Sequence, residues 1–211
     1  MPIELFYQDQ HVLLCCKPAG LDSEREFPAR LSGETGSDPL YCVHRLDRAA
    51  GGLMVYARSK AAAAGLSAQI AEGRLRKEYL AVVQGLPEEQ AVFKDLLYQD
   101  ASKNKSYVVR RMRRGVREAE LSYRLLERQG PWNLLRIRLV TGRSHQIRVQ
   151  FASRQMPLVG DTKYGSSFRD LPLALWSCSL AFSHPVTGEA LQFFAPPPLS
   201  RPWQVFQLPD C

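Results

Sequence analysis

The run HRLDRAAGGLMVYARS, residues 44–59, places a carboxylate between two arginines, directly before a pair of glycines and an apolar segment. An ionised aspartate is costly to bury unless a partner compensates it. Asp47 is therefore a candidate for chemistry, although an arginine–aspartate pair that closes a surface loop would show the same pattern. Residues 53–57 form the expected strand, and Gly51 and Gly52 at its entrance permit a close approach of neighbouring backbone.

Helices are expected at two places outside this run. The alanine-rich residues 60–73 predict a helix, with Leu66 and Ile70 one turn apart. A second helix is expected from Ser144, with Ser144 as its N-cap. Residues 21–40 mix Ser, Gly, Pro and charged residues without periodicity, so we expect a loop there.

Short apolar or alternating runs predict most of the strands. They lie at residues 11–16, 53–57, 76–85, 118–127, 133–140, 177–183 and 189–194. The turn at 129–131, Gln-Gly-Pro, is expected to join the strands 118–127 and 133–140 into a hairpin. We therefore expect an α+β fold: a single domain, residues 1–211, on a largely antiparallel mixed sheet with flanking helices and loops.

Bulk composition limits the class of protein. The chain has 211 residues, is 45% hydrophobic, and contains no apolar stretch of the ~18 residues that cross a bilayer. Its N-terminus lacks the basic and apolar segments of a signal peptide. We expect a cytoplasmic monomer with no membrane partner. The five cysteines, with no CxxC or HxxxH spacing, predict neither a disulfide framework nor a metal site; they are Cys15, Cys16, Cys42, Cys178 and Cys211.

The net charge of +7 favours a polyanionic partner, and nucleic acid is the first candidate. Residues 103–117 (KNKSYVVRRMRRGVR) concentrate this charge without any acidic residue. Like charges so close together repel unless a polyanion neutralises them, which favours phosphate contact over a merely solvated hairpin. Tyr107 could stack on a base. The basic residues of this run are Lys103, Lys105, Arg110, Arg111, Arg113, Arg114 and Arg117.

A second polar run, TGRSHQIRVQ at 141–150, supplies further candidates. Arg143 at the start of the predicted helix suits a phosphate. His145 could act as a general base, but no nucleophile lies beside it, so a hydrogen-bonding or phosphate-binding role is favoured. If Arg148 reaches inward, it needs a carboxylate partner, and Asp47 is the natural candidate.

Together these runs resemble the RluA family of RNA pseudouridine synthases over about residues 4–195. HRLD at 44–47 resembles the catalytic motif of that family, and RKEYLA at 76–81 its tyrosine motif. TGRSHQIR at 141–148, with MPLVGDTKYG at 156–165, resembles the third motif. Lys17-Pro18-x-Gly20-Leu21 resembles the first.

The resemblance implies a role for each matched residue. Asp47 would be the catalytic aspartate and would attack either the ribose anomeric carbon or the base. Tyr79 would pack against the target base and take part in proton removal from its C5 atom. Arg148 would be the buried partner of Asp47, and Arg45 would help to displace the target uridine from its stack. The family uses no cofactor and no metal, and its substrates include structured ribosomal and transfer RNA.

The chain departs from the family pattern at several positions. The family commonly has Thr-Ser before the strand glycine, where this chain has Ala50-Gly51, and a histidine where it has Gln150. Because the first motif starts at residue 17, we expect no N-terminal S4-type RNA-binding domain. The catalytic domain would then hold the RNA itself, with the run 103–117 contributing.

Two other function classes compete with an isomerase. One is an RNA-binding protein that keeps the fold without turnover, but such a protein does not need Asp47, Tyr79 and Arg148 together. The other is a hydrolase that uses Asp47 on a small glycoside, but it would lack an obvious second carboxylic acid. Serine-hydrolase, P-loop and dinucleotide-binding motifs are absent from the sequence.

Overall fold

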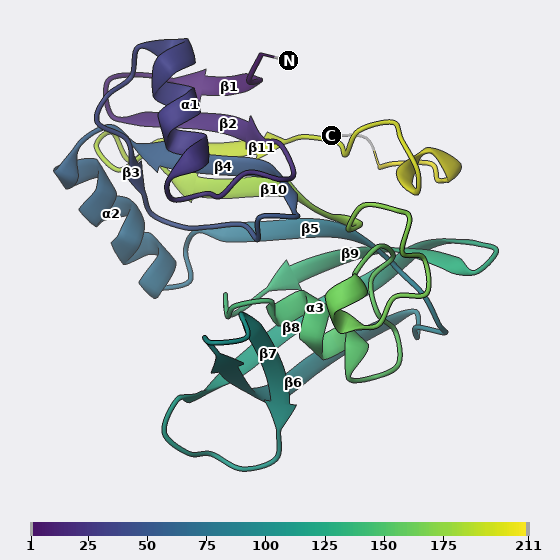
Figure 1. The fold of residues 1–211 in the computed structure, drawn as a ribbon. Helices are drawn as coiled ribbons and strands as arrows, with labels where there is room; N and C mark the ends of the chain where they lie inside the picture. The colour runs from purple at the N-terminus through teal and green to yellow at the C-terminus, as the bar shows by residue number, and fades with distance from the viewer. Residues whose placement is uncertain (1, 210–211) are drawn as a thin grey trace. The chain divides into compact units, whose positions relative to one another are not determined.

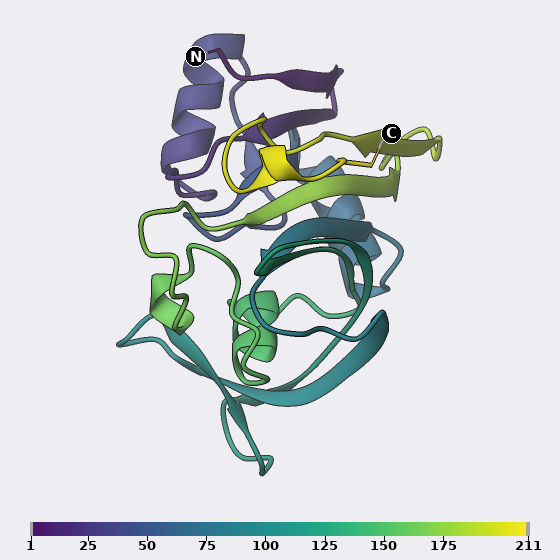
Figure 2. The ribbon, with the colours of Figure 1, turned by 90° about the vertical axis from the view of Figure 1, so that its right-hand side faces the viewer.

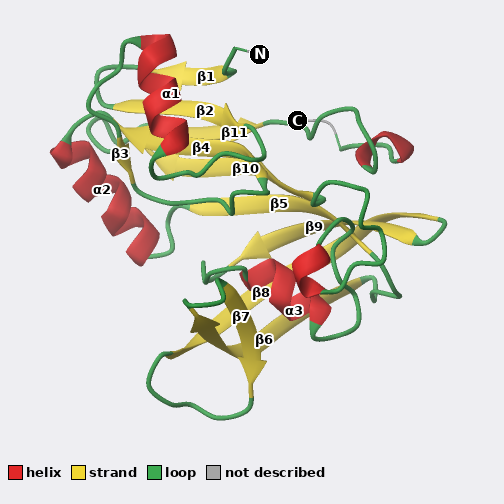
Figure 3. Cartoon of the chain, viewed as in Figure 1, coloured by secondary structure: helices red, strands yellow, loops and turns green. Residues whose placement is uncertain are grey.

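The computed structural model of the protein describes residues 2–209, so Cys211 lies outside the described residues. Within this range, eleven strands belong to one mixed sheet and three α-helices accompany them (Figures 1 and 3). The predicted α+β class and the largely antiparallel sheet are confirmed. The chain forms two compact units: unit 1 contains residues 2–78 and 176–197, and unit 2 contains residues 79–175 and 198–209.

Unit 1 is built on the strand order β1-β2-β4-β10, with β3 beside β4 and β11 beside β10. The pairing of β4 with β10 is parallel, and the other pairs are antiparallel. The strands are β1 (Leu5–Gln8), β2 (Val12–Lys17), β3 (Tyr41–Cys42), β4 (Gly51–Ala57), β10 (Leu175–Ser183) and β11 (Ala190–Phe194). The predicted strands at 11–16, 53–57, 177–183 and 189–194 are thus confirmed.

Helices α1 (Glu26–Thr35) and α2 (Lys60–Ala71) cover opposite faces of the unit 1 sheet, as the two views in Figures 1 and 2 show. Every residue of β4 is buried, because alternate side chains enter different cores. Leu53 and Val55 pack with Leu66 of α2. On the other face, the Tyr56 ring lies 6.0 Å from that of Phe27 in α1.

Helix α1 corrects the prediction of a loop at 21–40. The side chain of Asp22 accepts hydrogen bonds from the backbone N–H groups of Glu24 and Arg25, both at 2.9 Å, and Glu26 accepts one from the Asp22 N–H. These bonds satisfy donors that a helix start leaves unpaired. Pro28 lies in the first turn, where its missing N–H costs nothing.

Unit 2 contains the antiparallel order β9-β8-β6-β7, and β5 crosses from unit 1 into it. The strands are β5 (Arg76–Val83), β6 (Gln90–Asp100), β7 (Lys105–Val109), β8 (Val116–Gln129) and β9 (Trp132–Leu139). The predicted β8–β9 hairpin is confirmed, with Gln129 paired to Trp132 across the turn. The short helix α3 (Gln146–Ala152) packs through Phe151 against the rings of Phe93 and Tyr123.

The expected N-cap of α3 was wrong. The cap is His145, in a left-handed conformation with φ of 53°, and it makes no side-chain capping bond. Of the cysteines in residues 2–209, none is in a disulfide. No helix in this range has the length and apolar composition that spanning a membrane requires.

Candidate active site

The loop that carries Asp47 is held by hydrogen bonds to its backbone. The hydroxyl of Ser23 accepts from the Leu46 N–H (3.1 Å) and donates to the Leu46 carbonyl (2.9 Å). The buried ring of His44 accepts at Nε2 from the Val55 N–H (3.1 Å), which ties the loop to β4. Burial, followed by the charge of Lys77, holds the pKa of His44 well below its usual range, so His44 is neutral and structural.

Lys17 is a fully buried lysine that fixes the other side of this loop. Its ammonium donates to the carbonyl oxygens of Pro18 (2.9 Å), Leu21 (2.9 Å) and Arg48 (3.4 Å). Burial lowers the pKa of Lys17 to about 8, and nearby carboxylates, Asp47 among them, oppose this shift. Lys17 had no predicted role of its own. The signal for it in the sequence is a lysine at the end of an otherwise apolar strand.

Asp47 itself is half-buried, and its carbonyl accepts from the Ala50 N–H (3.0 Å) to close a turn. The arginines on either side point away into solvent. Arg45 lies 3.3 Å from Glu24, and Arg48 forms two bonds with Glu26. Arg45 is thus exposed on the same loop, as contact with RNA would require.

The departure from the family pattern at Gly51 has a steric cause. A Cβ atom there would overlap the indole ring of Trp176, which lies across the parallel β4–β10 pair. A Cβ atom at Gly52 would overlap the backbone of Ser177, and Gly52 has a φ of 115° that favours glycine. The Trp176 ring therefore takes the space of any side chain at position 51.

Arg148 reaches inward in unit 2, as predicted, and it is buried. Its Nε and Nη2 atoms donate to the two carboxylate oxygens of Asp161, at 2.7 and 2.8 Å. Such a bidentate pair fixes the plane of the guanidinium as well as its charge. Asp161 belongs to the segment 156–165 and was not among the predicted site residues. Asp47 belongs to unit 1, so its pairing with Arg148 stays a prediction.

The loop before α3 is fixed by Gln146. Its side-chain oxygen accepts from the Thr141 hydroxyl (2.8 Å) and from the Arg143 N–H (2.9 Å), and its amide donates to the Glu120 carbonyl (3.1 Å). Arg143 therefore lies in this loop rather than in the helix, and its side chain is exposed. His145 is buried, and its Nδ1 lies 3.0 Å from the hydroxyl of Tyr164. Its left-handed backbone is a conformation that functional loops often hold.

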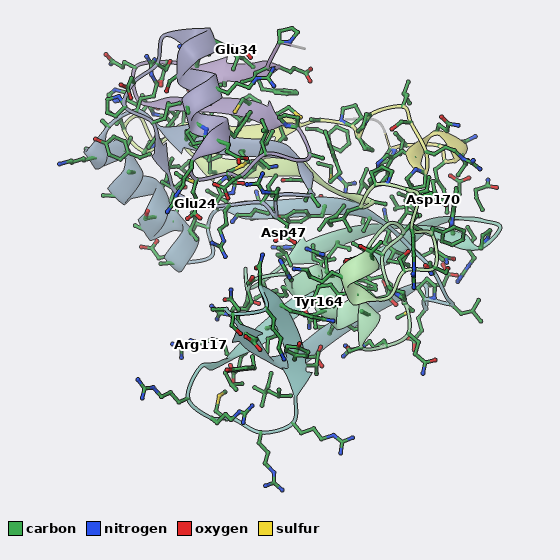
Figure 4. All side chains as sticks on the ribbon, viewed as in Figure 1. Glu24, Glu34, Asp47, Arg117, Tyr164 and Asp170 are labelled. Atoms are coloured by element: carbon green, nitrogen blue, oxygen red, sulfur yellow. The ribbon has the colours of Figure 1, made fainter. Side chains whose placement is uncertain are left out.

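The basic run spans β7 and the loop that leads into β8. Figure 4 shows nitrogen-tipped side chains pointing outward from this loop. Lys105 is partly buried, with its ammonium 5.2 Å from the Tyr164 ring, and Arg113 lies over the Tyr98 ring. Met112, between the arginines, is 57% exposed. The exposed cations are Lys103, Arg110, Arg111, Arg113, Arg114 and Arg117.

The remaining predicted residue, Tyr79, is buried on β5 at the start of unit 2. Unit 1 thus brings Arg45 and Asp47 together on one loop, and unit 2 brings together His145, the N-cap of α3, and Arg148 within that helix. Within residues 2–209, no three His, Cys, Asp or Glu side chains lie close enough to bind a metal ion.

Comparison with known proteins decides the family. A family model described as RNA pseudouridylate synthase matches residues 11–153, which is more than half of the chain. The chain belongs to the RNA pseudouridylate synthase family. Members are isomerases that convert uridine to pseudouridine in RNA, so this protein is an enzyme that acts on RNA. The match includes Asp47, Tyr79 and Arg148, which lie in the motifs that carried the resemblance.

Relatives of this pseudouridylate synthase agree in sequence and in fold. It is 33% identical over 217 residues to an uncharacterized RNA pseudouridine synthase of Synechocystis, covering 94% of this chain and 66% of the relative. It is 31% identical over 223 residues to the ribosomal large subunit pseudouridine synthase D of Zymomonas mobilis, covering 94% and 70%. The chain thus spans about two thirds of the length of these relatives. The human RNA pseudouridylate synthase domain containing 1 has the same fold, with a TM-score of 0.80 and 21% identity, covering 94% and 85%.

Proposed function

We propose that this chain converts a specific uridine of structured ribosomal or transfer RNA to pseudouridine, with Asp47 as the catalytic carboxylate. The observation that carries this proposal is a half-buried carboxylate on a loop whose backbone is fixed by Ser23, His44 and Lys17. Fixed loops suit catalysis because the reacting group needs no reordering. The whole chain, residues 1–211, acts as one catalytic domain.

The reaction is an isomerisation, so every atom of the uridine is retained except for the exchange of a proton. The C1′–N1 bond breaks, the base turns, and a C1′–C5 bond forms. The proton on C5 leaves to solvent and N1 gains one. Asp47 attacks either C1′, where a carboxylate stabilises oxocarbenium-like charge, or the base, where it forms an adduct.

The other matched residues serve this step. Tyr79, buried on β5, packs against the base and takes part in removing the C5 proton. Arg148 takes the role that the family resemblance implies for it, the cationic partner of the catalytic carboxylate. Arg45, exposed beside Asp47, helps to extrude the uridine from its stack.

RNA is held by exposed cations of unit 2. The run 103–117 presents its arginines to solvent on a loop, as phosphate contact requires. Arg143, exposed on the loop before α3, adds a phosphate contact, and His145 is the other candidate of that loop for contact with RNA. The name of the relative from Zymomonas mobilis, a ribosomal large subunit enzyme, favours ribosomal over transfer RNA. Action as a monomer in the cytoplasm stays a prediction.

The test uses purified protein with unmodified total RNA whose uridines carry tritium at C5. We expect tritium release by the wild type and none by Asp47→Asn, with the RNA dissociation constant of that variant nearly unchanged. Asp170→Asn is the matched control, because it removes an exposed carboxylate in unit 2 (Figure 4). Mapping the modified site then identifies the substrate.

Three outcomes separate the competing functions. Release that depends on Asp47 supports the isomerase. Salt-sensitive RNA binding without release from any RNA class supports a binding protein without turnover. If Asp47→Asn loses affinity as steeply as it loses rate, Asp47 acts in docking and the proposed catalytic role is wrong.

A further inference from the structure

The guanidinium of Arg148 touches an aromatic ring in addition to its carboxylate partner. Its central carbon lies 5.1 Å from the centre of the Tyr164 ring, a cation–π distance. Asp161 holds one edge of the guanidinium, through Nε and Nη2, and the ring makes the second contact. A planar cation with two such contacts is restrained in its orientation, so Tyr164 restricts the direction in which Arg148 points.

The hydroxyl of Tyr164 ties the same ring to strand β7. It accepts a hydrogen bond from the Ser106 N–H at 2.8 Å and lies 3.3 Å from the Ser106 carbonyl. It is also 3.0 Å from Nδ1 of His145. Because β7 pairs with β6 on its other side, Tyr164 satisfies backbone groups that an edge strand leaves open.

Two neighbouring bonds strengthen this connection between the basic run and the loop before α3. The buried hydroxyl of Ser106 donates to the Ser144 carbonyl at 2.7 Å. Lys163, next to Tyr164, donates to the Asn104 carbonyl at 2.9 Å. The segment 162–164 is therefore bonded to Asn104 and Ser106, on either side of the first residue of β7.

The Tyr164 ring also contacts a cation of the RNA-binding run. The ammonium of Lys105 lies 5.2 Å from its centre. One ring thus touches Lys105, which faces the RNA in the proposed function, and Arg148, which acts at the reacting uridine. A small rotation of the Tyr164 ring alters its contacts with both cations. A movement at Lys105 can therefore reach Arg148 without a change in the charge of either residue.

We propose that Tyr164 is a positioning residue, which sets the orientation of Arg148 and couples it to RNA bound along β7. This inference rests on the proposed function, because it assumes that Arg148 serves the isomerisation. The hydroxyl is the part that transmits the coupling, and the ring is the part that holds the guanidinium.

The test compares Tyr164→Phe, which keeps the ring and deletes the hydroxyl, with Tyr123→Phe. Tyr123 is a buried tyrosine of the same unit that packs on Phe93 and Phe151. Single-turnover tritium release should fall roughly 10- to 100-fold in Tyr164→Phe, because small displacements of catalytic groups have effects of this size. The RNA dissociation constant should change less than about twofold, since no phosphate contact is removed. Tyr123→Phe should leave the rate unchanged.

A second readout does not depend on activity. The NMR signal of the Arg148 Nε–H, which its bond to Asp161 protects, should move in Tyr164→Phe and remain in place in Tyr123→Phe. An unmoved signal, or a rate and an affinity that fall together, would overturn the positioning role. If instead the wild type releases no tritium while the signal moves as expected, the proposed function fails and the positioning of Arg148 stands.

Discussion

Gly51 and Trp176 are a matched pair of residues on adjacent parallel strands. The indole ring lies where a side chain at position 51 would begin, and its Nε1 donates to the Ala195 carbonyl at 3.0 Å. The ring is thus anchored and cannot turn aside cheaply. A serine at position 51, as the family pattern has it, is incompatible with this tryptophan.

Gly51→Ser should therefore lower the free energy of unfolding by about 1–3 kcal/mol, the usual cost of overpacking. Trp176→Leu in the same chain should restore much of that loss. Urea titration measures both, with Gly33→Ser in α1 as the control, because a Cβ atom there meets no neighbour within 4 Å. If Gly51→Ser and Gly33→Ser unfold at equal urea concentrations, the Trp176 ring moves freely and the prediction is wrong.

The ion pair of Arg148 with Asp161 makes a second prediction for a single residue. Asp161→Asn should lower the free energy of unfolding by about 3–5 kcal/mol, because it leaves a buried guanidinium with less compensating charge. Glu89→Gln is the matched control, since its pair with Arg128 is exposed and such pairs contribute about 0–1 kcal/mol. Thermal or urea unfolding measures the loss of stability in both variants. A loss in Asp161→Asn no larger than that in Glu89→Gln would contradict the prediction.

Some side-chain contacts of single residues could not be predicted from the sequence. Arg148 could be expected to reach inward, because it lies beside apolar residues on a helix. Its partner Asp161 is thirteen positions away across a turn, and no periodicity links them. Gln150, which departs from the family pattern, is fully buried and donates to Asp95 at 2.7 Å, so it serves the packing of unit 2. Such contacts depend on the tertiary fold.

At the level of elements, strong local patterns predicted the structure well. Helix α2 and the β8–β9 hairpin follow directly from helix propensity and alternation. Helix α1 was missed because only Phe27 and Leu31 face its core, and Pro28 and Gly33 resemble helix breakers. Strands β6 and β7 were missed because exposed residues interrupt their apolar positions.

The β7–β8 connection carries a prediction about RNA affinity. Changing Arg111, Arg113 and Arg114 to glutamine should weaken RNA binding and flatten its dependence on salt, because each lost phosphate contact lowers the slope by roughly 0.7–0.9. Binding isotherms at several salt concentrations measure the slope. A control variant changes the same amount of charge at exposed arginines elsewhere, namely Arg74, Arg124 and Arg169. A slope that matches this control would make the basic run a solvated hairpin.

For the molecule as a whole, buried ionisable groups predict how stability varies with pH. Burial lowers the pKa of Lys77 to about 8, and Lys17 behaves alike. Above about pH 8 the unfolded chain binds protons that the native chain lacks, so stability should rise with pH there and fall as pH drops through 8. Above about pH 9 the rise should end and reverse, because burial raises the pKa of the thiols of Cys15, Cys16 and Cys42, so that the native chain keeps protons that the unfolded chain releases.

Unfolding in guanidinium chloride, measured at about pH 7 and pH 9, checks this expectation. Lys77→Met should reduce the gain in stability between the two values, because it removes one of the two titrating lysines. Lys60→Met, which removes an exposed lysine at the start of α2, should leave the gain intact. If stability rises by the same amount between the two pH values in both variants, groups other than Lys77 cause the pH dependence.

Unit 1 is assembled from two pieces of chain, residues 2–78 and 176–197, with nearly all of unit 2 between them. During translation, strand β4 leaves the ribosome long before its parallel neighbour β10 has been made. One edge of β4 therefore remains unpaired while the strands of unit 2 that present the basic run can already fold. The loop of Asp47 adjoins that unpaired edge, so in the nascent chain the basic run can take its fold before the loop that carries Asp47 is fixed in place.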